Sequence, residues 1–72
     1  MQPPLTDDET ETLRLKLQDL TVEHRDLDEA IAHLLATPPK DELILRRMKK
    51  RKLQLKDRIA LIERMLEPDI PA

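Results

Sequence analysis

Apolar residues recur at alternating intervals of three and four along two stretches of this chain. Such spacing lines one side of a helix with apolar side chains, the heptad pattern of helices that pack against each other. We therefore expect one helix over about residues 7–36 and a second over about residues 40–67. Together the two stripes define fourteen positions, here called the seam: Leu13, Leu17, Leu20, His24, Leu27, Ile31, Leu34, Leu45, Met48, Lys52, Leu55, Ile59, Ile62 and Leu66.

Prolines separate the two stripes. Pro38 and Pro39 lie between them, and a proline pair inside a helix removes hydrogen-bond donors and clashes with the preceding turn. One continuous rod is therefore not expected. We predict a turn at residues 37–39, which makes the two helices antiparallel neighbours. The expected fold is all-α, a single hairpin domain over residues 1–72 that resembles a coiled coil.

Other residues refine the hairpin. Thr6 and Glu9 have the spacing of a capping box, which predicts that the first helix begins at Thr6 or Asp7. Pairing residues whose numbers sum to 79 sets apolar seam positions opposite each other, with Leu20 facing Ile59. In this register three interhelix charge pairs are expected: Arg14 with Glu63, Asp28 with Lys49, and Glu23 with Arg58.

Two seam positions are polar, His24 and Lys52. A polar residue in a seam costs stability but specifies alignment, so we interpret both as register devices. Lys52 is long enough to bury its methylenes while its ammonium reaches water or Asp28. The alternative is a proton-sensitive or metal-binding site at His24 and Asp28. Two ligands from one helix leave a zinc site incomplete, so the register interpretation is favoured.

A basic stretch occupies the start of the second predicted helix. Six of the seven residues 46–52 are cationic, which is typical of phosphate contacts. The alternative is that this stretch balances the acidic first half, where residues 1–36 carry nine acidic and three basic side chains. No aromatic residue is present to stack on a base, so nucleic-acid binding is the second hypothesis. The candidate phosphate or partner contacts are Arg46, Arg47, Lys49, Lys50 and Arg51.

Within the two predicted helices, eight large apolar residues fall outside the seam, among them Leu35, Leu43 and Ile44. A two-helix hairpin has no second layer to cover them. We therefore predict a homo-oligomer, with two hairpins paired as a dimer into a four-helix bundle. The residues expected to form this self-association surface are Leu15, Val22, Leu53, Leu61 and Met65.

Composition excludes several classes of protein. The 72 residues contain no Cys, Gly or Ser, so disulfides, glycine-rich phosphate loops and the usual acyl-transfer nucleophiles are absent from the sequence. No apolar run is long enough to span a membrane. We expect a cytoplasmic protein that is not an enzyme and uses no cofactor, metal or membrane. Its expected role is a helical interaction module that binds a protein partner.

Several of these residues also form a motif. His24, Leu27, Asp28 and Ile31, followed by the run Lys49-Lys50-x-Lys52-Leu53-x-Leu55-Lys56-Asp57, resemble the YdcH-like family of small bacterial proteins over roughly residues 17–66. The resemblance implies a short helical or coiled-coil structure and a cytosolic bacterial origin. The family has no known function, so the resemblance supplies no substrate, cofactor or catalytic residue.

This chain departs from the family pattern in modest ways. Arg46 and Arg47 precede the lysine run, and Arg58 stands where the pattern usually has an acidic residue. The family pattern places polar residues at the seam positions of His24 and Lys52. That placement agrees with a shared register device and equally with a shared binding surface.

Overall fold

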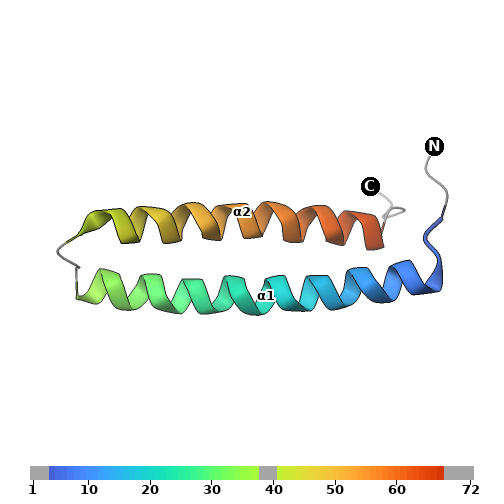
Figure 1. Cartoon of the computed structure of the whole chain (residues 1–72), viewed down its shortest axis with the longest axis horizontal. Coiled ribbons are helices and arrows are strands. Elements are labelled where there is room, and N and C mark those ends of the chain that lie inside the picture. The colour runs from blue at the N-terminus through green and yellow to red at the C-terminus, as the bar shows by residue number, and fades with distance from the viewer. Residues whose placement is uncertain (1–3, 38–40, 68–72) are drawn as a thin grey trace.

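The computed structural model describes residues 4–37 and 41–67. Within these ranges the chain forms two helices, α1 (Asp7–Ala36) and α2 (Glu42–Leu66), and no strand. The two helices lie side by side and run in opposite directions (Figure 1). The predicted all-α antiparallel hairpin is therefore confirmed. Apart from Thr37, the turn predicted at residues 37–39 lies outside the described residues.

The first helix begins with the predicted capping box. The Thr6 hydroxyl oxygen accepts a hydrogen bond from the Glu9 backbone N–H at 3.1 Å. In return, Oε1 of Glu9 accepts one from the Thr6 backbone N–H at 3.2 Å. Asp7, Asp8 and Glu9 place negative charge at the positive end of the helix dipole. These local interactions fix where α1 begins without help from tertiary packing.

The second helix begins two residues later than the sequence suggested. Asp41 stands outside the helix as its N-cap, and its side chain accepts a hydrogen bond from the Leu43 backbone N–H at 2.9 Å. Because this cap uses an extended backbone at Asp41, the first helical residue is Glu42. The helix ends at Leu66, where the Glu67 backbone N–H donates to the Glu63 carbonyl oxygen at 3.0 Å.

The seam forms the contact between the helices. All fourteen seam positions are buried or half-buried, and no other described residue of α2 is. Their main cluster centres on the buried side chains of Leu20, Leu55 and Ile62. The half-buried seam residues that pack against it are Leu13, Leu17, Leu27, Ile59 and Leu66. The three- and four-residue spacing thus identified the buried face of both helices.

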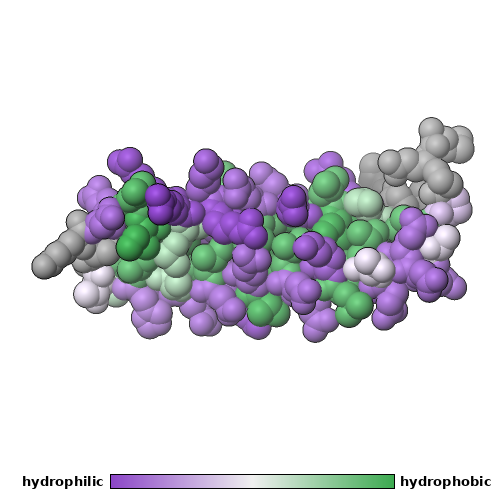
Figure 2. Space-filling model, in the orientation of Figure 1, coloured by the Kyte–Doolittle hydropathy of each residue, from purple (hydrophilic) through white to green (hydrophobic). Residues whose placement is uncertain are grey.

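Apolar side chains also lie on the outside of the hairpin. One face shows them scattered between hydrophilic residues along the length of both helices (Figure 2). Within residues 4–37 and 41–67, the exposed large apolar residues are the eight predicted outside the seam: Leu15, Val22, Leu35, Leu43, Ile44, Leu53, Leu61 and Met65. Among the described residues each helix packs against only the other one, so its remaining faces have no helix to cover them there.

Candidate functional site

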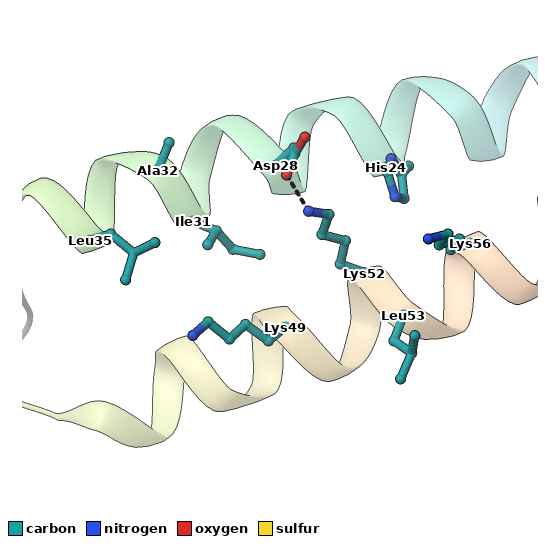
Figure 3. A pocket seen from close by; sticks show the side chains of 9 residues that line it. All are labelled: His24, Asp28, Ile31, Ala32, Leu35, Lys49, Lys52, Leu53 and Lys56. Carbon is teal, nitrogen blue, oxygen red and sulfur yellow. Dashed lines mark ion pairs between the residues drawn. The ribbon is translucent and has the colours of Figure 1, made fainter.

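An ion pair crosses the seam at Lys52. This side chain extends from α2 to α1, where its ammonium contacts a carboxylate oxygen of Asp28 (Figure 3). The hydrogen bond and positive charge of Lys52 lower the pKa of Asp28 below its ordinary value. The Lys52 side chain is about one-third exposed, so its stem covers apolar surface while its charge reaches the solvent boundary. The sequence had anticipated this partner for the lysine.

His24 lies one turn before Asp28 on the same side of α1. Its Nε2 atom is buried and has no hydrogen-bond partner among the described residues. An unpaired buried polar atom costs about 1–3 kcal/mol relative to a paired one. A loss of stability of this kind is expected for a polar residue in the seam. A role in setting the register stays a prediction.

The interhelix charge pairs differ from those expected. Asp28 pairs with Lys52 rather than Lys49, because Lys52 emerges from the seam directly beside it. Glu23 pairs with Arg51 rather than Arg58. Nε and Nη2 of Arg51 both donate to the same Glu23 oxygen, at 3.1 and 3.0 Å. Two hydrogen bonds from one guanidinium stabilise this ion pair more than a single hydrogen bond would.

The third expected pair, Arg14 with Glu63, is not formed in the described part of the chain. Both side chains are exposed. A pair between exposed charges is worth only about 0–1 kcal/mol, so helix packing does not need it. The opposite charges of the two helices therefore predicted that they attract each other, but not which side chains form ion pairs.

Most cations of the basic stretch have no ion-pair partner in the described part of the chain. Arg51 pairs with Glu23. The other four predicted contact residues are exposed, and no ion pair within residues 4–37 and 41–67 includes them: Arg46, Arg47, Lys49 and Lys50. The acidic first helix therefore neutralises only part of the stretch, and an open basic surface remains on α2.

An open groove of about 590 Å³ runs beside the polar seam residues (Figure 3). Residues from both helices line it: His24, Asp28, Ile31, Ala32, Leu35, Lys49, Lys52, Leu53 and Lys56. It thus brings the predicted polar residues His24, Lys52 and Asp28 together with one of the five candidate phosphate or partner contacts, Lys49, and one residue of the predicted self-association surface, Leu53. The other members of those two sets lie outside this groove.

The sequence interpretation missed Lys56 as a site residue. Lys56 follows Lys49 by seven residues, so the two lie on the same side of α2 beside the seam. Asp28 and Leu35 flank the seam at the same interval on α1. This second seven-residue series beside the seam is the sequence signal that would have included Lys56 among the candidate site residues.

No group of three or more metal-capable side chains occurs among the described residues. Within the same ranges, neither helix combines the length and apolar character needed to cross a membrane.

Comparison with known proteins places the chain in a family. Residues 17–63, well over half of the chain, match the family model described as "Protein of unknown function (DUF465)". No curated protein and no solved structure matches the chain. The matched range covers the seam from Leu17 to Ile62, the polar seam residues and the basic stretch. The chain therefore belongs to this family, an uncharacterised small domain that includes the YdcH-like proteins.

Proposed function

We propose that this domain acts through protein–protein contacts, and that two hairpins pair into a four-helix bundle. The observation that carries the proposal is the set of eight exposed large apolar side chains, whose exposure ranges from 39% at Met65 to 61% at Leu53. A single exposed apolar residue is ordinary on a protein surface. Several on a two-helix hairpin are typical of an interaction surface.

The small core supports the same proposal. Among the described residues only four apolar side chains are buried: Leu20, Ile31, Leu55 and Ile62. Domains of this length rarely gain enough stability from one core and usually need a staple or a partner. The sequence contains no cysteine for a disulfide. In a four-helix bundle each helix gains a second neighbour, which covers apolar surface that the single hairpin leaves in water.

Self-association is tested by sedimentation equilibrium together with thermal melts followed by circular dichroism over a wide range of concentrations. We expect a dimer and a melting temperature that rises with concentration, because folding is then coupled to assembly. A chain that sediments as a monomer throughout, with an unchanged melting temperature on dilution, would contradict the proposal.

Matched variants locate the surface. Leu15→Glu with Leu61→Glu places charge on the predicted self-association surface and is expected to yield a monomer. Gln18→Glu with Gln54→Glu introduces the same charge at exposed polar positions of the same two helices and is expected to leave the dimer intact. If both double variants dissociate equally, added charge rather than the chosen surface is responsible, and the assignment of Leu15 and Leu61 is wrong.

We propose binding rather than catalysis, because the sequence lacks the serine and cysteine nucleophiles that acyl transfer uses. The test is a hydrolytic assay with model esters. Turnover that His24→Ala abolishes would contradict a purely binding role. A cytoplasmic location is a further prediction from the sequence.

Nucleic-acid binding is the second candidate function. It is favoured by the four exposed cations of the basic stretch that have no ion-pair partner among the described residues. Binding of a fluorescent DNA or RNA duplex should then weaken steeply as salt rises. Arg46→Gln with Arg47→Gln should reduce both the affinity and the salt slope. Absence of binding at low salt would eliminate this candidate.

A further inference from the structure

The groove beside Lys52 carries more positive than negative charge. Lys49, Lys52 and Lys56 line it from α2, and Asp28 is the carboxylate among its lining residues. Asp28 is already paired with Lys52. Within the described ranges Lys49 and Lys56 have no ion-pair partner, so two ammonium groups remain available beside the groove.

The two available lysines are regularly spaced. Lys49 and Lys56 are seven residues apart on one side of α2, a separation of about 10.5 Å along a helix. Leu53 lies between them in the sequence and also lines the groove. A cation, an apolar side chain and a second cation thus follow one another over about two helical turns.

The groove is also apolar. Ile31 is buried at its base, and Leu35 and Leu53 are 57% and 61% exposed at its sides. The close-up shows Ile31, Ala32 and Leu35 in succession along α1, with Lys49 of α2 opposite this stretch and Lys56 opposite His24 (Figure 3). A ligand in this groove therefore meets apolar surface and positive charge together.

We infer that this groove binds an acidic amphipathic helix of a partner protein, with an apolar side chain against Leu53 and carboxylates on Lys49 and Lys56. The assignment rests on the proposed protein–protein function and names its class of partner. A partner helix with carboxylates seven residues apart and an apolar residue between them matches the lysine spacing in both distance and charge.

The apolar lining distinguishes this partner from nucleic acid. A phosphate backbone uses cations but gains nothing from Leu35 or Leu53, and the chain has no aromatic side chain for base stacking. Of the four basic-stretch cations without an ion-pair partner in the described structure, Arg46, Arg47 and Lys50 lie outside the groove lining. Binding in the groove is thus separable by mutation from binding to the outer basic surface.

The test is a fluorescence titration of the full chain with a labelled synthetic helical peptide that carries two glutamates seven residues apart around a leucine. Lys49→Gln with Lys56→Gln should weaken binding about tenfold or more, because two charge-assisted contacts are lost. Arg46→Gln with Lys50→Gln makes the same change of net charge on exposed residues outside the groove and should weaken it by less than about threefold. Leu53→Ala should also weaken binding, and a peptide with glutamines in place of glutamates should bind poorly.

Three outcomes would overturn the inference. The first is an equal loss of peptide binding in the two double variants, which indicates unspecific attraction. The second is a single-stranded oligonucleotide that binds at the same salt with the same dependence on Lys49, Lys56 and Leu53. The third is loss of self-association in the groove variant, which indicates that a second copy occupies the groove.

Sedimentation of the same samples separates this inference from the proposed function. If the unaltered chain dimerises but no peptide binds, the groove assignment fails and the proposed pairing stands. If the unaltered chain is monomeric and still binds the peptide through Lys49 and Lys56, the pairing fails and the groove assignment stands.

Discussion

The two halves of the hairpin are built differently. In the chain-end half, which contains the seam from Leu13 to Leu20 and from Leu55 to Leu66, every seam residue is apolar and the main buried cluster forms. In the turn half, the seam contains His24 and Lys52, and Ile31 is its one buried side chain among the described residues. The chain-end half holds most of the buried apolar contact between the helices. The turn half holds the Lys52–Asp28 ion pair, the groove and the Nε2 atom of His24, which has no hydrogen-bond partner in the described residues.

Under the proposed function, this difference divides the surface of a very short chain between folding and binding. Apolar seam residues stabilise the hairpin in proportion to the area they remove from water. Polar seam residues reduce that stabilisation, so the fold tolerates them only where a neighbouring segment buries enough apolar surface. The polar residues of this seam lie next to Leu20 and Leu55, which are the most completely buried side chains of the described structure.

The largest effect is expected in the chain-end half. Leu55 is fully buried, with 0% exposure, so Leu55→Ala should destabilise the fold by about 2–5 kcal/mol through lost burial and an unfilled cavity. The matched control is Gln54→Ala on the same helix, at an exposed position outside the predicted self-association surface, where the expected change is within about 0.5 kcal/mol. Urea unfolding followed by circular dichroism measures both. Similar losses in the two variants would erase the difference between seam and outer surface.

The second effect has the opposite sign and belongs to the turn half. His24→Leu removes a buried nitrogen that has no hydrogen-bond partner in the described residues, so it should stabilise the fold by about 1 kcal/mol or more. The same unfolding experiment measures it, with His33→Leu at an exposed position as the control. A destabilised His24→Leu variant would show that the imidazole makes an interaction the seam depends on.

The third effect compares the two helix starts. Thr6→Ala removes one side of a reciprocal capping box and should cost about 1 kcal/mol. Asp41→Ala removes a single capping hydrogen bond in the turn half and should cost less than about 1 kcal/mol. If Thr6→Ala costs no more stability than Asp41→Ala, the position of a helix start in the hairpin matters more than the number of capping hydrogen bonds.

The smallest effect is dependent on pH. Because Lys52 lowers the pKa of Asp28 in the folded state, the stabilisation from this pair is present above the unfolded value of about 4 and is lost as pH falls through the folded value. Asp28→Asn should therefore be slightly less stable than the unaltered chain at neutral pH and equal to it in strong acid. A stability difference that stays constant across this range would show that the carboxylate charge is not responsible.

The sequence predicted the fold more fully than the site. The seam, the capping box and the exposed apolar set all follow from spacing, because helix geometry places each residue relative to its own axis. Glu23 was assigned Arg58 but pairs with Arg51, and of the two partners expected for Asp28, Lys49 and Lys52, only Lys52 pairs with it, because spacing does not rank several cations within reach of one carboxylate. Lys56 was missed because it lies outside both the seam and the basic stretch. The groove depends on both helices together, which a pattern read along one helix does not describe.

Residue-resolved amide hydrogen exchange tests the division between the two halves most directly. We expect the strongest protection for the amides around Leu17 to Leu20 and Leu55 to Ile62, with clearly faster exchange for those around Asp28 and Lys49 under the same conditions. Protection that is uniform along both helices, or greatest beside the groove, would contradict the account.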